Sequence, residues 1–194
     1  MSINEIIDGC KKGNKNSHSL LYDKFAGKLY GISLRYIGKT AEAQDVLQDS
    51  MIKIFRNIPS VKYTTEESFF SWMKRITVNT ALNHLRDNLK YSNIEKINDY
   101  EHESLTEYED DFSAYDELLE HLTKEKLFGM IKDLPDGYRT IFNLYAIENY
   151  SHKEISEQLG VSISTSKTQL FKARRILTAK INEILEKKLI MKVI

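Results

Sequence analysis

The chain has 194 residues, with 28 lysines and arginines against 28 aspartates and glutamates, and one cysteine, Cys10. This length suits one large or two small domains, and a single cysteine excludes an internal disulfide framework and a metal site made of thiolates alone. No apolar run approaches the ~20 residues that cross a bilayer, and the N-terminal charges follow an apolar patch, the wrong order for a secretory signal, so we expect a cytoplasmic protein.

The zero net charge hides three segments of different charge. Residues 1–94 carry a net charge of +5, residues 95–120 carry −10, and residues 121–194 carry +5. Charge counted by segment therefore predicts two mildly basic halves separated by a strongly acidic strip.

Apolar residues at helical spacing predict three helices in the first half of the chain. These helices run from about Ser19 to Tyr36, from Ala41 to Ile58, and from about Glu67 to Leu89. Thr40 is the expected N-cap of the second helix, and Pro59 follows its end.

Helical periodicity fails between Lys90 and Glu120, where like charge is dense and aliphatic residues are few. Such a composition disfavours a packed core. We expect an acidic flexible linker over residues 91–122, helical at most near its end.

Two helices are predicted directly after this strip. The first begins at Thr123 or Lys124 and ends at Pro135, and the second covers the segment GYRTIFNLYAIENY. The predicted fold is all-α: two small helical domains, residues 1–90 and 123–194, joined by the acidic linker.

A helix-turn-helix is predicted in the last third of the chain. Ser151, with Glu154 three residues later, has the spacing of a capping box and marks the start of its first helix. Gly160 marks the end of that helix, and the second helix runs from about Ser164 to Lys188. The C-terminal domain is therefore expected to be a four-helix helix-turn-helix domain.

The second helix of this motif carries the residues expected to contact DNA. No acidic residue occurs between Gln158 and Asn182, whereas five cations do, and phosphate neutralisation requires such a patch. Hydroxyls and free N–H groups at the helix start suit a phosphate, and Gln169 could pair with adenine if it faces the groove. The alternative is an ordinary solvated face. The candidate residues are Ser164, Thr165, Lys167, Thr168, Gln169, Phe171, Lys172, Arg174 and Arg175.

The two halves together carry a family resemblance. The run LPDGYRTIFNLYAIENYSHKEISEQLGVSISTSKTQLFKARRIL is similar to region 4 of extracytoplasmic-function (ECF) sigma factors, which reads the −35 promoter element. The runs LLYDKFAGKLYGISLRYIGKTAEAQDVLQDSMIKIFRNI and SFFSWMKRITVNTALNHLR resemble region 2 of the same family. The resemblance implies a sigma factor that directs bacterial RNA polymerase to specific promoters and stabilises the opened −10 element.

In region 2, the helix resembling AEAQDVLQDSMIKIF implies docking on the clamp of the largest polymerase subunit. Its outer residues form a mixed polar face with one exposed aliphatic side chain, as a helix-on-helix interface uses. An ordinary solvated face is the alternative. The candidate polymerase-binding residues are Asp45, Gln48, Asp49, Ile52 and Lys53.

The resemblance also implies a −10 site in the loop Val61–Ser68 and the helix after it. Unpaired bases need an aromatic platform or a pocket; Tyr63 matches an aromatic position of the family, and Asn79 matches its base-contacting asparagine. Trp72 could equally belong to the core. The candidate −10 residues are Tyr63, Trp72, Lys74, Arg75, Asn79, Asn83 and Arg86.

The chain departs from the family pattern in the −35 helix. Many relatives carry glycine, valine and arginine where this chain has Ser164, Ser166 and Gln169, so we expect a shifted −35 preference. The promoter loop KYTTEES lacks the glycine often found there.

No cofactor or small-molecule substrate is expected; the implied partners are the polymerase core, promoter DNA and an anti-sigma factor. The acidic linker could thread through basic channels of polymerase or act as a solvated spacer. A stand-alone helix-turn-helix regulator is one alternative function. An enzyme is another, but the five histidines are scattered and no catalytic motif appears; His84 and His152 are expected to be polar surface residues.

Overall fold

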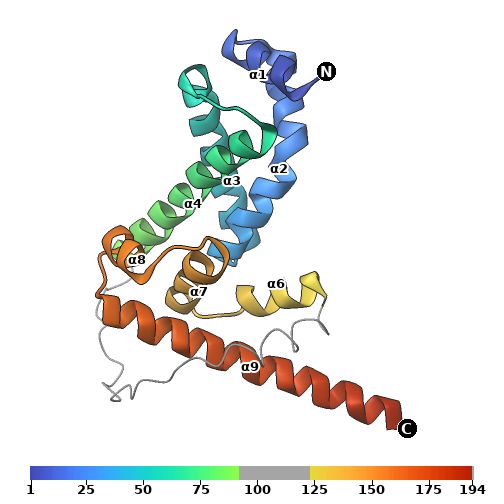
Figure 1. Cartoon of the computed structure of the whole chain (residues 1–194), viewed down its shortest axis with the longest axis vertical. Coiled ribbons are helices and arrows are strands. Elements are labelled where there is room, and N and C mark those ends of the chain that lie inside the picture. Colours follow the sequence, from blue (N-terminus) through green and yellow to red (C-terminus); the bar gives the residue numbers. More distant parts are fainter. Residues whose placement is uncertain (92–122, 194) are drawn as a thin grey trace. The chain divides into compact units, whose positions relative to one another are not determined.

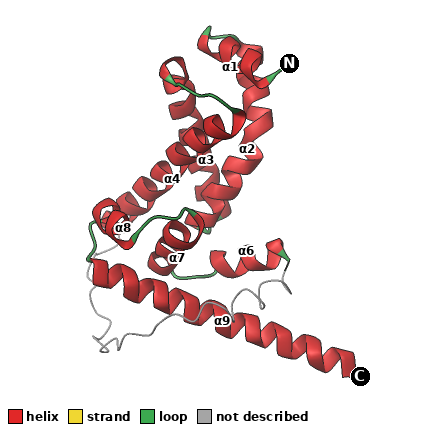
Figure 2. Cartoon of the chain, in the orientation of Figure 1, coloured by secondary structure: helices red, strands yellow, loops and turns green. Residues whose placement is uncertain are grey.

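The computed structural model describes residues 1–91 and 123–193, in a chain that divides into two compact units, Met1–Ile94 and Glu95–Ile194. Every regular element in the described residues is a helix, and no strand occurs among them (Figure 2). The predicted all-α fold is confirmed. The predicted linker lies outside the described residues except for Tyr91, which ends a helix.

The first unit consists of four α-helices and one 3₁₀ turn in its described part (Figure 1). These are α1 (Ile3–Lys11), α2 (Lys15–Ile37), α3 (Thr40–Asn57), η1 (Ile58–Ser60) and α4 (Glu66–Tyr91).

Helix α1 was not predicted, although the chain encodes its start. The Ser2 Oγ accepts a hydrogen bond from the Glu5 N–H at 3.3 Å, and the Glu5 carboxylate accepts one from the Ser2 N–H at 2.7 Å, which completes a capping box. The helix packs tightly on α2, since a Cβ added at Gly9 would lie 2.0 Å from the Ser17 Oγ. A glycine is therefore required at this crossing.

Two of the predicted helix starts differ from the structure. Helix α2 begins at Lys15, four residues earlier than expected, because Asn14 caps it by accepting a hydrogen bond from the Ser17 N–H at 3.1 Å. The prediction of Thr40 as an N-cap is wrong: Thr40 is the first helical residue of α3, and the extended Lys39 takes the cap position without a side-chain bond.

Helices α2, α3 and α4 lie against one another and enclose the core of the first unit (Figure 1). Each contributes the apolar stripe that its sequence spacing predicts. The largest buried side chains from these helices include Phe25 and Leu29 of α2, Ile54 of α3, and Phe69 and Met73 of α4.

The described part of the second unit contains α6 (Lys124–Lys132), α7 (Asp136–Phe142), the π-helical turn η3 (Asn143–Ile147), α8 (His152–Leu159) and α9 (Ile163–Val193). The four predicted helices are thus present, and the second one ends in the π turn. Helix α9 crosses α6, α7 and α8, and its buried Ala173, Leu177 and Ile181 pack with Met130 and Leu134.

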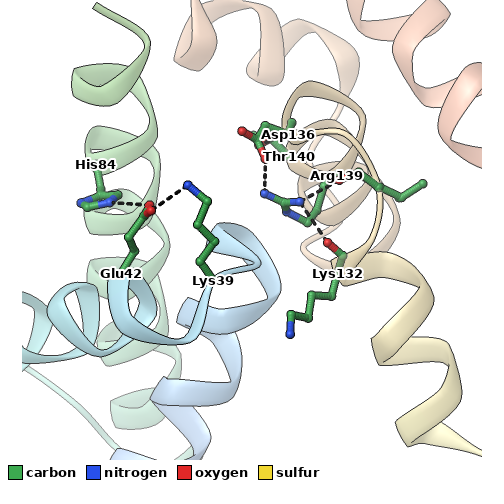
Figure 3. A network of polar contacts seen from close by, with 8 residues as sticks. Lys39, Glu42, His84, Lys132, Asp136, Arg139 and Thr140 are labelled. Carbon is green, nitrogen blue, oxygen red and sulfur yellow. Dashed lines mark hydrogen bonds and ion pairs between the residues drawn. The ribbon is translucent and has the colours of Figure 1, made fainter. Parts of the chain in front are cut away.

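A buried arginine holds the turn between α6 and α7. The Arg139 guanidinium donates hydrogen bonds to the carbonyl oxygens of Lys132 at 3.0 Å and Leu134 at 2.7 Å, and it pairs with the Asp136 carboxylate (Figure 3). These bonds satisfy carbonyls at the end of α6. The side chain of Arg139 therefore holds the turn that connects α6 to α7.

Candidate nucleic-acid interface

Helices α8 and α9 form the predicted helix-turn-helix. Ser151 and Glu154 make the capping box that their spacing predicts, and Gly160 ends α8 in the left-handed region at φ 70°, which a glycine adopts without strain. The Ser162 Oγ then accepts a hydrogen bond from the Thr165 N–H at 2.9 Å. A hydroxyl therefore caps each helix of the motif.

One face of α9 brings together most of the residues predicted to contact −35 DNA. At 100° per residue, five of them fall within an arc of about 100°. Three members of this face, Ser164, Lys167 and Arg175, are exposed. Thr168 and Phe171 share the face and are half-buried.

The other predicted residues of α9 lie beside this face or behind it. Thr165 serves the helix cap through its hydroxyl, 2.8 Å from the Ser162 Oγ, and Lys172 is half-buried. The Gln169 amide lies against the start of α7, where a Cβ added at Gly137 would be 2.8 Å from its Oε1. An adenine contact by Gln169 requires that its amide face the groove, whereas in this structure the amide packs against Gly137.

Arg174 is buried, and its guanidinium carbon lies 5.6 Å from the centre of the Tyr145 ring. The Tyr145 ring in turn stacks on His152 at 4.5 Å, and the His152 Nδ1 lies 2.9 Å from the Ser166 Oγ. His152, expected to be a polar surface residue, is half-buried and contacts Tyr145 of η3 and Ser166 of α9. A sequence search for DNA contacts could not find this cluster, since three different elements supply it.

In the first unit, α4 presents a second polar face. Trp72, Arg75, Asn79, Asn83 and Arg86 fall within an arc of about 80°, and all of them except the half-buried Trp72 are exposed. The Asn83 Oδ1 accepts a hydrogen bond from Arg86 at 3.4 Å.

Lys74 is not part of this polar face, since it lies about 200° around the helix from Trp72. Trp72 has its ring 5.5 Å from the buried Phe69. The half-buried tryptophan therefore packs on the core from one edge of the polar face, and its role at the −10 element stays a prediction.

Tyr63 lies in the loop before α4, with its ring packed edge-on against Phe69 at 5.3 Å. The Lys11 ammonium lies 5.4 Å from the ring centre. Burial, with the nearby charge of Asp8, raises the pKa of the Tyr63 hydroxyl. The loop itself is closed by Ser68, whose Oγ accepts hydrogen bonds from two successive backbone N–H groups.

Four of the five predicted polymerase-binding residues lie on the outer face of α3. Asp45, Gln48, Asp49 and Ile52 fall within an arc of about 100° and are all exposed, Ile52 to 55%. Lys53 lies toward α4 instead, where its ammonium donates a hydrogen bond to the Thr80 hydroxyl at 3.1 Å.

A carboxylate joins the start of α3 to α4. Glu42 accepts hydrogen bonds from the Lys39 ammonium at 2.8 Å and lies 3.3 Å from the His84 Nε2 (Figure 3). The bond to Lys39, and then the one to His84, lowers the pKa of Glu42. His84, expected to be a polar surface residue, is half-buried and is a partner of Glu42.

Among the described residues, no group of three or more histidine, cysteine, aspartate or glutamate side chains is arranged to hold a metal ion. None of the helices in the described part of the chain is long and apolar enough to span a membrane.

Comparison with known proteins shows the family of both units. The family model for sigma-70 region 2 matches residues 21–90, and the model for sigma-70, region 4 matches residues 124–177. An ECF RNA polymerase sigma-E factor from Haemophilus influenzae is 28% identical over 183 residues, covering 93% of this chain and 95% of the relative. The ECF RNA polymerase sigma factor SigW from Bacillus subtilis is 27% identical over 190 residues, covering 95% and 99%.

Two solved complexes of lower identity also resemble the chain. One is CnrH in complex with the cytosolic domain of CnrY, with a TM-score of 0.43, 19% identity, and coverage of 92% of this chain and 96% of that one. The other is the sigma factor RpoE with the anti-sigma factor NepR from Bartonella quintana, with a TM-score of 0.46, 16% identity, and coverage of 86% and 96%.

The two helical units, one matching region 2 and the other region 4, define a promoter-specific transcription initiation factor of the sigma-70 type. The chain belongs to the ECF group of RNA polymerase sigma factors. The resemblance drawn from the sequence is confirmed.

Proposed function

We propose that this sigma factor divides its work among three surfaces: the outer face of α3 binds the clamp of the polymerase core, the exposed stripe of α4 holds the opened −10 element, and α9 reads the −35 element. One observation supports this assignment most directly. On both α4 and α9, most of the predicted DNA contacts cluster on one face of the helix, and the opposite face fills the core. A helix divided in this way can bind DNA without loss of its packing.

The −10 surface combines the two kinds of group that such a site needs. Exposed amides at Asn79 and Asn83 can hydrogen-bond base edges, and Arg75 and Arg86 along one side of the stripe can neutralise phosphates. The half-buried Trp72 and Tyr63 offer aromatic edges at the same end of α4. The arrangement suits a single strand whose bases have left the duplex.

We further propose that the functional domains are residues 1–90 and 123–194, with residues 91–122 as the connecting linker. The chain catalyses no reaction of its own and acts in the cytoplasm, where bacterial RNA polymerase transcribes. One of the similar solved structures holds an anti-sigma factor, and we propose an inhibitor of that kind as a partner of this chain.

Run-off transcription tests the proposal. Purified core polymerase, a pool of promoter fragments and this chain are combined, and the transcripts are sequenced. We expect initiation from a defined subset of promoters only when the chain is present. Transcription that is equal with and without the chain would contradict the proposed function.

A further inference from the structure

Ser166 places a hydroxyl group inside the second unit. The residue has no exposed surface, and it lies about 200° around α9 from Ser164, on the side away from the proposed DNA-binding face. Its Oγ is 2.9 Å from the His152 Nδ1 at the start of α8. A buried hydroxyl that loses its partner costs free energy, so this bond is a specific link between the two helices of the motif.

A second contact, on the face of the His152 ring, also holds this imidazole. The Tyr145 ring lies nearly parallel to it, with an interplanar angle of 24° and ring centres 4.5 Å apart. Arg174, about two turns after Ser166 on α9, has its guanidinium over the same tyrosine ring. His152 and Tyr145 therefore contact α9 through two residues, Ser166 and Arg174, and these contacts oppose rotation of α9 about its own axis.

Besides the ion pair of Lys180 with Asp133 at 3.5 Å, α9 packs on its unit through apolar side chains. Leu170, Ala173 and Leu177 are buried, and apolar packing is non-directional. A hydrogen bond, by contrast, weakens steeply when its angle changes. The bond to Ser166 is thus suited to define the rotation of α9, and with it the direction in which Lys167 and Thr168 point.

We infer that His152 is a positioning residue for −35 recognition: through Ser166 it holds α9 in the orientation that presents its outer face to DNA. This inference rests on the proposed −35 role of α9. His152 itself need not touch DNA, because its effect passes through the direction of the neighbouring side chains of α9.

The test uses the full chain with core polymerase and two promoters that share one downstream element. The first keeps the upstream element that wild type selects from the pool, and the second has that element scrambled. The measured quantity is the ratio of transcripts from the two. The variants are His152→Asn, whose amide can replace the Nδ1, His152→Leu, which cannot bond, and Ser166→Ala. Thr178→Val is the control, because the Thr178 hydroxyl donates a hydrogen bond within α9, to the Arg174 carbonyl at 3.0 Å.

We expect His152→Leu and Ser166→Ala each to lower the ratio about tenfold, as the loss of a bond to a buried hydroxyl allows. His152→Asn and Thr178→Val should stay within about twofold of wild type. The double variant His152→Leu, Ser166→Ala should lose no more than either single variant, since both remove the same bond. Far-UV circular dichroism at the assay temperature verifies that each variant keeps its helices. If His152→Leu unfolds, the result for Ser166→Ala decides the test.

Three results would overturn the inference: a ratio unchanged in Ser166→Ala, an Asn variant as impaired as the Leu variant, or losses that multiply in the double variant. A wild-type chain that shows no upstream preference would instead overturn the proposed −35 role, and the inference with it. The wild-type ratio therefore separates the two failures.

Discussion

Neighbouring cations on α9 differ in exposure. The role of a residue therefore depends on the side of the helix that it occupies. Arg175 is exposed on the outer face, whereas Arg174, one residue earlier, is buried over Tyr145. A step of 100° separates two consecutive residues. A cationic run in the sequence therefore overstates the number of charges that can reach a phosphate.

Asn79 gives the sharpest residue-scale prediction. Its amide is exposed in the middle of the proposed −10 stripe on α4, on a different helix from the proposed polymerase-binding residues of α3. We expect Asn79→Ala to lower transcription at promoters with an intact −10 element about tenfold, since a good base contact contributes about 1–3 kcal/mol of discrimination. Promoter-pool transcription measures this effect.

Binding of core polymerase should be unchanged in Asn79→Ala, as measured by fluorescence anisotropy of the labelled chain. Ile52→Ala is the matched control, because Ile52 is exposed on α3. We expect this variant to weaken polymerase binding and to leave −10 selection unchanged. Loss of polymerase binding in Asn79→Ala would refute the role assigned to this residue.

Glu42 predicts a dependence of stability on pH. Its pKa is lowered in the folded state, first by the hydrogen bond from Lys39, so its contribution is present above the ordinary value of 4.5 and is lost as pH falls through the folded pKa. We expect the urea midpoint of the first unit to fall more steeply below pH 4.5 in wild type than in Glu42→Gln. The fluorescence of Trp72, the one tryptophan in the chain, reports unfolding of this unit.

Asp45→Asn is the control for this titration, since Asp45 is an exposed carboxylate on the outer face of the same helix. Equal slopes for wild type and Glu42→Gln between pH 4.5 and pH 3 would show that the Lys39–Glu42–His84 contact contributes nothing to stability.

At the scale of elements, helix ends are decided by single side chains. Ser151 begins α8, and the Glu154 carboxylate accepts hydrogen bonds from its N–H at 2.8 Å and its hydroxyl at 2.7 Å. The same arrangement begins α1 at Ser2. Both helices are short, so propensity alone would not hold them, and their caps matter more than in a long helix such as α4.

Ser151→Ala should therefore lower the free energy of unfolding of the second unit by about 1 kcal/mol. Native-state hydrogen exchange of the α8 amides measures this locally. Glu157→Ala, at an exposed position of the same helix, is the control and should change exchange little. If both variants exchange equally fast, the capping box does not stabilise α8.

At the scale of the whole molecule, two basic halves and an acidic strip share one chain whose net charge is zero. Each basic half has exposed arginines on a polar helix face, Arg75 and Arg86 on α4 and Arg175 on α9, which favours weak electrostatic attraction to DNA. Neither half alone offers the paired half-sites that a dimeric regulator reads. Specific binding is therefore expected to need the polymerase that carries both halves.

A gel shift checks this expectation. With the chain alone, we expect no band that survives excess competitor DNA, whereas core polymerase plus the chain should give a competitor-resistant complex on a promoter selected by run-off. Core polymerase alone is the control. A specific, competitor-resistant complex formed by the chain alone would favour the stand-alone regulator.

The sequence by itself determined the helical class, the capping box at Ser151, the end of α8 at Gly160 and the family, because periodicity, caps and motifs are written in residues close together along the chain. Only the tertiary structure decided that Arg174 is buried, that Gln169 lies against Gly137, and that His152 bonds Ser166. These contacts join segments that are distant in sequence. Which side of a helix meets a neighbouring element depends on the packing of the whole unit, and that packing is not contained in any local pattern.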